Sequence, residues 1–259
     1  MRILFFGDIV GKVGRRVIKD HLPSLKEQYK IDFIIANAEN ATHGKGLSLI
    51  HYKELTFYGI DAITMGNHYL RVNEVITNNS AYTNMVRPAN MHKSIPGVGS
   101  KLFTCKNKTI RVTNLIGTSF IQGASFNPFD CLDQIVKETK QDIHFVDFHA
   151  ETTAEKKALA FAFDGKVSAI VGTHTHTQTN DEEILPNKTA FITDVGMNGL
   201  NLSVLGVIKD GPIHNMWTNV PSKFVIPETG LGLLNAVVIT FDDLTNIPTN
   251  IEKIRIREK

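Results

Sequence analysis

Short apolar runs that alternate with helix-like stretches are the feature that most constrains the fold of this 259-residue chain. Five runs look like buried strands: RILFFG, IDFIIANA, IDAITMG, DIHFVDF and VSAIVGT. Helices are expected between and around them, near residues 14–29, 48–58, 129–140 and 152–163. Strands that alternate with helices in this way are typical of an α/β fold.

The expected elements carry several local signals. The helix at 14–29 contains Pro23, which should interrupt or bend it. Thr152 and Glu155 have the spacing of a capping box. The late runs LLNAVVITFD and IEKIRIR suggest antiparallel additions to the sheet, and the basic tail KIRIREK fits an edge strand. No linker, repeat or low-complexity segment interrupts the chain, so residues 1–259 are expected to form a single domain.

Composition and charge exclude several classes of protein. The net charge is +2, too small and too scattered for a nucleic-acid footprint, although a short RNA is not excluded as a partner. No apolar run approaches the 18 or so residues that would predict a membrane span, and no signal peptide is expected at the N-terminus. Cys105 and Cys131 lack a CxxC pattern and are expected as free thiols of a cytoplasmic protein.

Polar residues stand where each of the five apolar runs ends. In order along the chain they are Asp8, Glu39 with Asn40, Asn67 with His68, His149, and His174 with His176. In open α/β sheets the carboxyl ends of the strands form the edge where ligands bind. One such residue alone would be a turn or cap residue, but five strand ends with this pattern predict a shared cluster.

The stretch VGTHTHTQT bears most directly on that cluster. Residues i and i+2 of an extended chain point to the same face, so His174 and His176 could enter one pocket, although a solvated loop is the alternative. Mixed carboxylate, amide and imidazole ligands suit iron, manganese or zinc, and six of them exceed a four-coordinate structural zinc site. They suit two metal ions that share a carboxylate. Several other histidines are expected to be surface or incidental: His21, His51, His92, His144 and His214.

The order of these residues resembles that of the calcineurin-like metallophosphoesterases. Their blocks are an early Asp, an acidic block, Gly-Asn-His, a lone His and a terminal HxH. The motifs FGDIVG, NAENATHGKGL, DAITMGNH, VRPAN, DFHAETTAEK, VGTHTHTQT and ITDVGMNG are more closely similar to the YmdB-type bacterial branch, over nearly the whole chain.

The resemblance implies a fold, an activity and roles for residues. The implied fold is a layered α/β/β/α sandwich with mixed sheets. The implied activity is that of a dinuclear-metal phosphodiesterase on a small phosphodiester, in the first place a 2′,3′-cyclic nucleotide. A metal-bridging hydroxide would attack phosphorus, Asn40 would hold phosphoryl oxygens and His68 would be the general acid. The implied metal ligands are Asp8, Glu39 and His176 for one ion, and Glu39, Asn67, His149 and His174 for the other, with iron preferred over manganese or zinc.

Departures from the wider superfamily keep alternatives open. Val10 stands where most members have a histidine, and Glu39-Asn40 replaces Gly-Asp; both changes are shared with the YmdB-type branch. No acid follows His68, so its orienting partner is not identified. Phosphomonoesterase and nuclease activities therefore stay open, as does a metal-binding regulatory protein with little turnover.

Three further features are interpreted less specifically. Asp147 and Asp194 could orient ligating histidines, and a plain role at the edge of the core is at least as plausible for each. The segment 211–227, with the sole tryptophan Trp217, is expected as a packed surface loop. A lid or a subunit contact in a homo-oligomer is the alternative for that segment.

Overall fold

Two mixed β-sheets packed face to face form the centre of the protein. The computed structural model describes residues 1–259. The first sheet contains β1 (Arg2–Phe6), β2 (Asp8–Ile9), β3 (Phe33–Asn37), β4 (Ala62–Thr64), β5 (Met85–Val86), β12 (Met197–Leu200), β13 (Gly232–Phe241) and β14 (Pro248–Arg257). The second contains β6 (Ser100–Cys105), β7 (Lys108–Ile116), β8 (Ile143–His149), β9 (Ala169–Thr173), β10 (Glu183–Ile184) and β11 (Ala190–Ile192).

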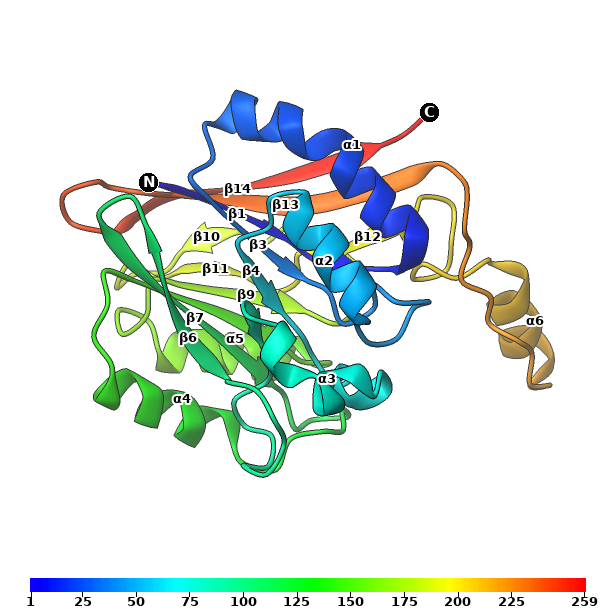
Figure 1. The fold of residues 1–259 in the computed structure, drawn as a ribbon, viewed down its shortest axis with the longest axis horizontal. Helices are drawn as coiled ribbons and strands as arrows, with labels where there is room; N and C mark the ends of the chain where they lie inside the picture. The colour runs from blue at the N-terminus through cyan, green and yellow to red at the C-terminus, as the bar shows by residue number, and fades with distance from the viewer.

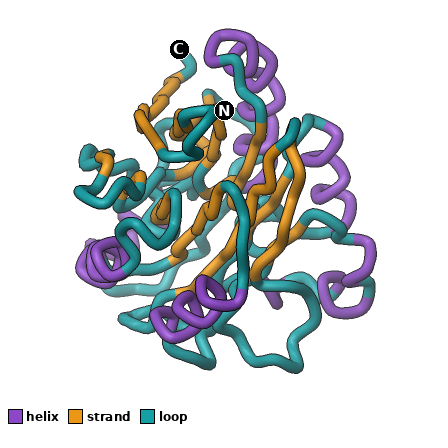
Figure 2. The backbone as a smooth tube through the Cα atoms, turned by 90° about the vertical axis from the view of Figure 1, so that its left-hand side faces the viewer, coloured by secondary structure: helices purple, strands orange, loops and turns teal.

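Helices cover the outer faces of both sheets (Figure 1). Helices α1 (Gly11–Tyr29) and α2 (Leu49–Phe57) cover the first sheet, and α4 (Pro128–Glu138) and α5 (Thr153–Ala162) cover the second. The remaining elements are α3 (Glu74–Thr77), α6 (Asp210–Thr218) and the 3-10 turns η1 (Tyr69–Arg71) and η2 (Asn79–Ala81). From the side, the strands run through the middle and the helices lie outside them (Figure 2). This is the expected α/β/β/α sandwich.

The strand order explains why the predicted ligands share an edge. The first sheet runs β2-β12-β13-β1-β3-β4-β5, with β14 paired to β13, and the second runs β10-β11-β9-β8-β7-β6. Strands β1, β3, β4 and β5 are parallel, as are β7, β8, β9 and β11. The antiparallel additions predicted near the C-terminus are β13 and β14, and the basic tail forms an edge strand as expected.

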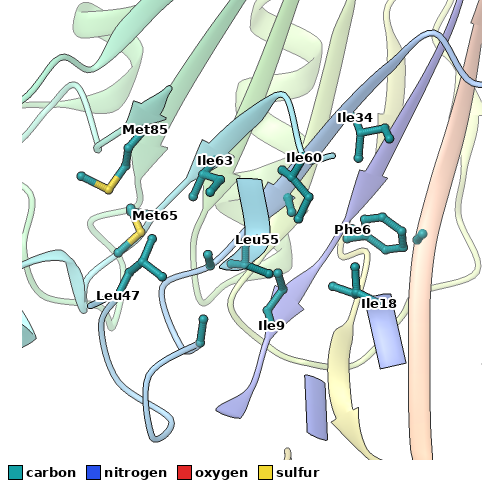
Figure 3. Close-up of a cluster of buried hydrophobic side chains, with 14 of the residues drawn as sticks. Phe6, Ile9, Ile18, Ile34, Leu47, Leu55, Ile60, Ile63, Met65 and Met85 are labelled. Carbon is teal, nitrogen blue, oxygen red and sulfur yellow. The ribbon is translucent and has the colours of Figure 1, made fainter. Parts of the chain in front are cut away.

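Three apolar layers hold the sandwich together, because successive strand residues face opposite sides. Leu4 and Phe6 face α1 and α2, in a cluster that also contains Ile18 and Leu55 (Figure 3). Phe5 faces the other way, into the layer between the sheets. Its ring stacks on Phe145 of β8, with the centroids 5.4 Å apart. A third cluster packs the second sheet against α4 and α5.

The expected helices differ from the observed ones in detail. An interruption or a bend was predicted at Pro23. Helix α1 begins at Gly11 and is continuous through Pro23, so there is no interruption. Its buried face, which includes Val17 and Leu25, packs on the first sheet and holds the helix across the missing hydrogen bond. At α5, Thr152 accepts a hydrogen bond from the Glu155 amide as a cap should, at 3.3 Å.

The structure also tests the expectations for the segment 211–227 and for the cysteines. The segment is not a packed loop, because it contains α6, and Trp217 is 85% exposed. Cys105 and Cys131 are free thiols, as expected. None of the helices combines the length and the apolar character that crossing a membrane would require.

His144, expected at the surface, is instead buried in β8. Its Nε2 lies 2.8 Å from Thr113 Oγ1, and its Nδ1 has no hydrogen-bond partner. Burial, together with the positive charge of Arg111, lowers the pKa of His144 to about 3. The folded protein therefore keeps this ring neutral where an unfolded chain, with a histidine pKa of about 6.5, takes up a proton.

His144 should consequently make the protein sensitive to mild acid. Between the two pKa values the unfolded state binds the extra proton, so the free energy of unfolding falls as pH falls below about 6.5. His144→Gln cannot titrate, and from pH 7 to pH 5 the wild type should lose about 2 kcal/mol more than the variant. Urea unfolding of both proteins at the two pH values measures this. Equal losses in wild type and variant would contradict the assignment.

Candidate metal centre and active-site pocket

The predicted ligand residues lie together where the carboxyl ends of the parallel strands of both sheets meet. Distances around His149 Nε2 are 3.1 Å to Glu39 Oε1, 3.1 Å to Asn67 Oδ1 and 3.0 Å to His174 Nδ1. Asp8 Oδ1 lies 3.8 Å from His149 Nδ1 and 3.9 Å from His176 Nε2. The structure thus brings together all six residues that were predicted as metal ligands.

The two histidines of the HxH motif reach the cluster by a different route from the one predicted. Strand β9 ends at Thr173, and the backbone of His174 and His176 has φ values of +99° and +63°. This left-handed region is unfavourable for residues other than glycine. The extended-chain geometry expected for His174 and His176 is therefore wrong, and a strained turn presents both rings.

Buried acceptors hold this turn in place. Asp8 Oδ2 accepts a hydrogen bond from the His174 amide at 3.0 Å. Asp194 Oδ2 accepts from the Thr175 amide at 3.1 Å and from the ammonium group of buried Lys156 at 2.7 Å. Asp194 thus supports the backbone of the turn, and it does not orient an imidazole ring.

The hydrogen bonds of the imidazoles leave their other nitrogens facing the cluster. His149 Nδ1 is 2.9 Å from Thr173 Oγ1, which donates to Asp147 Oδ1 at 2.7 Å. His176 Nδ1 donates to the Leu205 carbonyl at 2.9 Å. Ligating histidines usually hold their second nitrogen in this way. Asp147 therefore does support a candidate ligand, through the hydroxyl group of Thr173.

His174 is held by a residue that the sequence analysis did not identify. Its Nε2 lies 3.0 Å from Glu151 Oε2, which leaves Nδ1 toward His149. Glu151 stands two residues after His149, within a motif already noted, but spacing alone does not show that its carboxylate faces another strand's histidine. Thr173 was missed for the same reason.

The cluster fits a metal ion on two further observations. Asp8 Oδ1 is fully buried and has no hydrogen-bond partner, which is costly unless a cation or proton approaches it. Glu39, His149 and His174 place ligand atoms within 4.8 Å of one another. Gly66 leaves space for the cluster, because a Cβ atom there would lie 2.2 Å from Glu39 Oε2 and 2.5 Å from His149 Nε2.

Electrostatics also favour a cation at this position. Burial opposes a charge on His149, yet the carboxylates of Glu39 and Asp8 raise its pKa to about 9. Burial and the neighbouring His149 lower the pKa of His174 to about 3. Without a metal the cluster therefore attracts a proton, and a metal ion has to displace it, so acid should weaken metal binding.

His68 is oriented by Asn40, which supplies the partner that the sequence did not reveal. His68 Nδ1 lies 2.7 Å from Asn40 Oδ1 and 3.2 Å from Glu39 Oε1. The Asn40 amide nitrogen is 3.1 Å from His176 Nε2. Because an amide oxygen only accepts, His68 keeps a proton on Nδ1. Its Nε2 forms no hydrogen bond with the protein.

A cavity of about 440 Å³ lies next to this cluster. Its polar side includes Glu39, Asn40, His68, His174 and His176, and its opposite wall is apolar, with Val10, Leu205, Val207, Phe224 and Ile226. The wall comes largely from the segment around α6, which projects from the sandwich at the right of Figure 1. A pocket with convergent polar groups and an apolar wall is typical of a small-molecule site.

Thr173→Val should weaken metal binding, because it removes the hydroxyl group that links His149 to Asp147 while keeping the side-chain shape. We expect a 10–100-fold loss of metal affinity or activity. Competition with a chelator measures the affinity. Thr113→Val is the matched control, since its hydroxyl group contacts His144 outside the cluster, at 2.8 Å. Equal metal affinity in Thr173→Val and wild type would contradict this role.

Solved structures with similar folds define the class of the protein. A *Staphylococcus aureus* structure named as a 5′-nucleotidase matches 100% of this chain and 55% of its own, with a TM-score of 0.62 at 17% identity. A *Mycoplasma pneumoniae* structure described as a novel phosphatase matches 100% of this chain and 94% of its own, with a TM-score of 0.94 at 41% identity. The protein is a phosphoric ester hydrolase with the calcineurin-like metallophosphoesterase fold, which implies divalent metal ions.

Sequence comparison defines the family within that class. The model of the YmdB-like protein family matches residues 4–254. The 2′,3′-cyclic-nucleotide 2′-phosphodiesterase of *Bacillus subtilis* is 44% identical over 260 residues, covering 100% of this chain and 98% of the relative. The chain belongs to the YmdB-like family.

Proposed function

We propose that the protein hydrolyses a small phosphodiester, a 2′,3′-cyclic nucleotide, with two transition-metal ions. The observation that carries the proposal is that His68, with its Nε2 unpaired, and residues of the ligand cluster line the same cavity of about 440 Å³. The *B. subtilis* relative named for this activity supports the choice of substrate. Iron is the preferred metal, with manganese or zinc as alternatives.

The proposed ligands divide into two groups that share Glu39. Asp8 and His176, with Glu39, would hold one ion; Asn67, His149 and His174, with Glu39, would hold the other. The short distances around His149 and the unpaired Asp8 Oδ1 support this division. When bound, the ions would polarise the phosphoryl group and lower the pKa of bound water.

The chain's own residues would supply proton transfer and binding. In the proposed reaction His68 gives the proton on Nε2 to the leaving ribose oxygen while Nδ1 keeps its hydrogen bond to Asn40. Asn40 thus has a positioning role in addition to the expected contact with phosphoryl oxygens. Phe224 and Leu205 offer an apolar face to the base. The reaction would proceed within residues 1–259 as one domain, since both sheets supply ligands.

The alternatives use the same site. A phosphomonoesterase would act on the same cavity with a different phosphoester, and a nuclease of long duplexes is disfavoured by the net charge of +2. A metal-binding regulator with little turnover is also possible at this site, but it would not need His68 as a general acid. We further propose a cytoplasmic location, where free thiols such as Cys105 and Cys131 stay reduced.

Turnover of 2′,3′-cyclic AMP by metal-loaded protein tests the proposal, with 3′,5′-cyclic AMP and p-nitrophenyl phosphate as competing substrates and chelator-treated protein as the control. Metal content is measured on every sample. We expect metal-dependent cleavage of the 2′,3′-cyclic nucleotide, faster than that of the other two. Preferred turnover of the monoester would replace the proposal by a phosphomonoesterase. Full metal content without turnover of any of the three would favour the regulator.

A further inference from the structure

A second cavity, of about 260 Å³, lies beside β5 and β6, the edge strands of the two sheets, and shares no residue with the active-site pocket. It lies between the end of β5, the turn η2 and the start of β6. Two of its residues, Arg87 and Lys101, are basic, and none of its ten lining residues is acidic. The cavity therefore has a positive charge that its own walls do not neutralise.

Arg87 is the central feature of this cavity. The residue is only 7% exposed, and its hydrogen-bond partners are backbone carbonyl groups, with no carboxylate among them. Nε donates to the Gly97 carbonyl at 3.2 Å and Nη1 to the Pro88 carbonyl at 2.6 Å. Nη2 has no hydrogen-bond partner, yet it is not sealed from solvent. One nitrogen of the guanidinium group is therefore available to donate, in a residue that lines the cavity.

Burying a charge without a counter-ion is unfavourable, and native proteins normally pair such a group. The two carbonyl groups satisfy donors of Arg87 but contribute no negative charge. Burial accordingly lowers the pKa of Arg87, with no carboxylate among the groups that oppose this. A bound anion would supply the missing charge.

Lys101 reinforces the same argument from the other side of the cavity. Its ammonium group donates to the Thr83 carbonyl and makes no ion pair. That single contact leaves two of its three N–H groups for another acceptor. Ser80 and Thr83 add hydroxyl groups at the exposed rim. A forked guanidinium, an ammonium group and hydroxyl groups together suit the several oxygens of a tetrahedral oxyanion.

From these contacts we infer that the Arg87 cavity is a binding site for a small phosphate-class anion, either free phosphate or a phosphate monoester. Its volume of about 260 Å³ far exceeds the space that one water needs, so a phosphate group with a small substituent fits. The site is separate from the metal cluster, and the inference does not depend on the proposed function. Tyr69, which follows His68, lines the cavity and donates through its hydroxyl group to the Pro96 carbonyl at 2.8 Å.

Titration of zinc-loaded protein with anions, followed by NMR, tests the inference. The amide resonances of Gly97 and Val98 are recorded, because these two residues line this cavity and not the active-site pocket. One arm uses inorganic phosphate and the other ribose 5-phosphate. We expect saturable shifts in wild type, and about tenfold weaker binding in Lys101→Ala, from the loss of a charged hydrogen bond. Lys140→Ala, at an exposed lysine outside the cavity, should bind as wild type does. Tighter binding of ribose 5-phosphate would identify a monoester as the ligand, and equal binding would identify the phosphate group alone.

A second variant and a crystal soak test the inference independently of the first titration. Arg87→Lys keeps the charge but loses the fork, and it should weaken phosphate binding more than Lys101→Ala does. If that variant does not fold, Lys101→Ala still decides. Selenate soaked into crystals of the metal-loaded protein should give anomalous density beside Arg87. Any one of three results would overturn the inference: no resonance shift at millimolar phosphate, unchanged phosphate affinity in Lys101→Ala, or selenate bound only at the metal cluster.

Discussion

His68→Ala should lower kcat for 2′,3′-cyclic AMP by about 10²–10⁴-fold while the metal content stays at the wild-type value. The reason is its position: the ring is not among the proposed metal ligands, and its Nδ1 lies 2.7 Å from Asn40 Oδ1 and 3.2 Å from Glu39 Oε1. Nε2 remains as the group that can give a proton to the leaving oxygen. The variant therefore removes a proton donor and leaves the ligand set complete.

Steady-state kinetics beside metal analysis checks this expectation. His214→Ala is the matched control, since His214 is an exposed histidine on α6 that does not line the pocket. Its kcat should equal that of wild type. Turnover by His68→Ala within a few-fold of wild type, at equal metal content, would remove His68 from the reaction.

Asp8→Asn should reduce metal binding by more than the roughly 100-fold expected for a residue that only supports a ligand. The amide oxygen can still accept the hydrogen bond from the His174 amide, now 3.0 Å from Asp8 Oδ2, so the HxH turn should keep its shape. The variant loses the negative charge and the unpaired Oδ1 that faces the cluster. Activity should fall with metal content and be recovered only in part by added metal.

The same variant should be at least as stable as wild type when both are metal-free. Asp8 is completely buried, and burial raises its pKa, so a neutral amide avoids the cost of burying a charge. Thermal unfolding of chelator-treated proteins measures this. Asp61→Asn is the control, because Asp61 also accepts from a backbone amide, that of Ile34 at 2.8 Å, outside the site. Unchanged metal content in Asp8→Asn would refute its role as a ligand, and lower stability without metal would refute the account of its burial.

Much of the fold could be predicted because the apolar runs report burial directly. After Arg2, β1 is apolar at every position, since one face of the strand meets the helices and the other meets the second sheet. Parallel strands deliver their carboxyl ends to one edge, so the positions of Asp8, Glu39 and His149 in the sequence predicted a shared cluster. The continuity of α1 through Pro23 was not predicted, because packing on the first sheet can override local propensity. Helix α6 was missed because Gly211 and Pro212 are typical of a loop, although proline is tolerated in the first turn of a helix.

In the site too, some features could be predicted from the sequence and others could not. The sequence alone determined which residues are available at the strand ends, because the alternation of apolar runs and polar ends is a local property of the chain. Only the tertiary structure decided how they are held: Asn40 against His68, Thr173 between His149 and Asp147, and the left-handed turn at His174. These contacts join residues that are distant in the sequence. Pairing of neighbouring parallel strands brings Asn40 to His68 and Thr173 to His149. Only the packing of the two sheets brings Asp8 of the first sheet to the backbone of the His174 turn, since that packing sets the distances between side chains from different sheets.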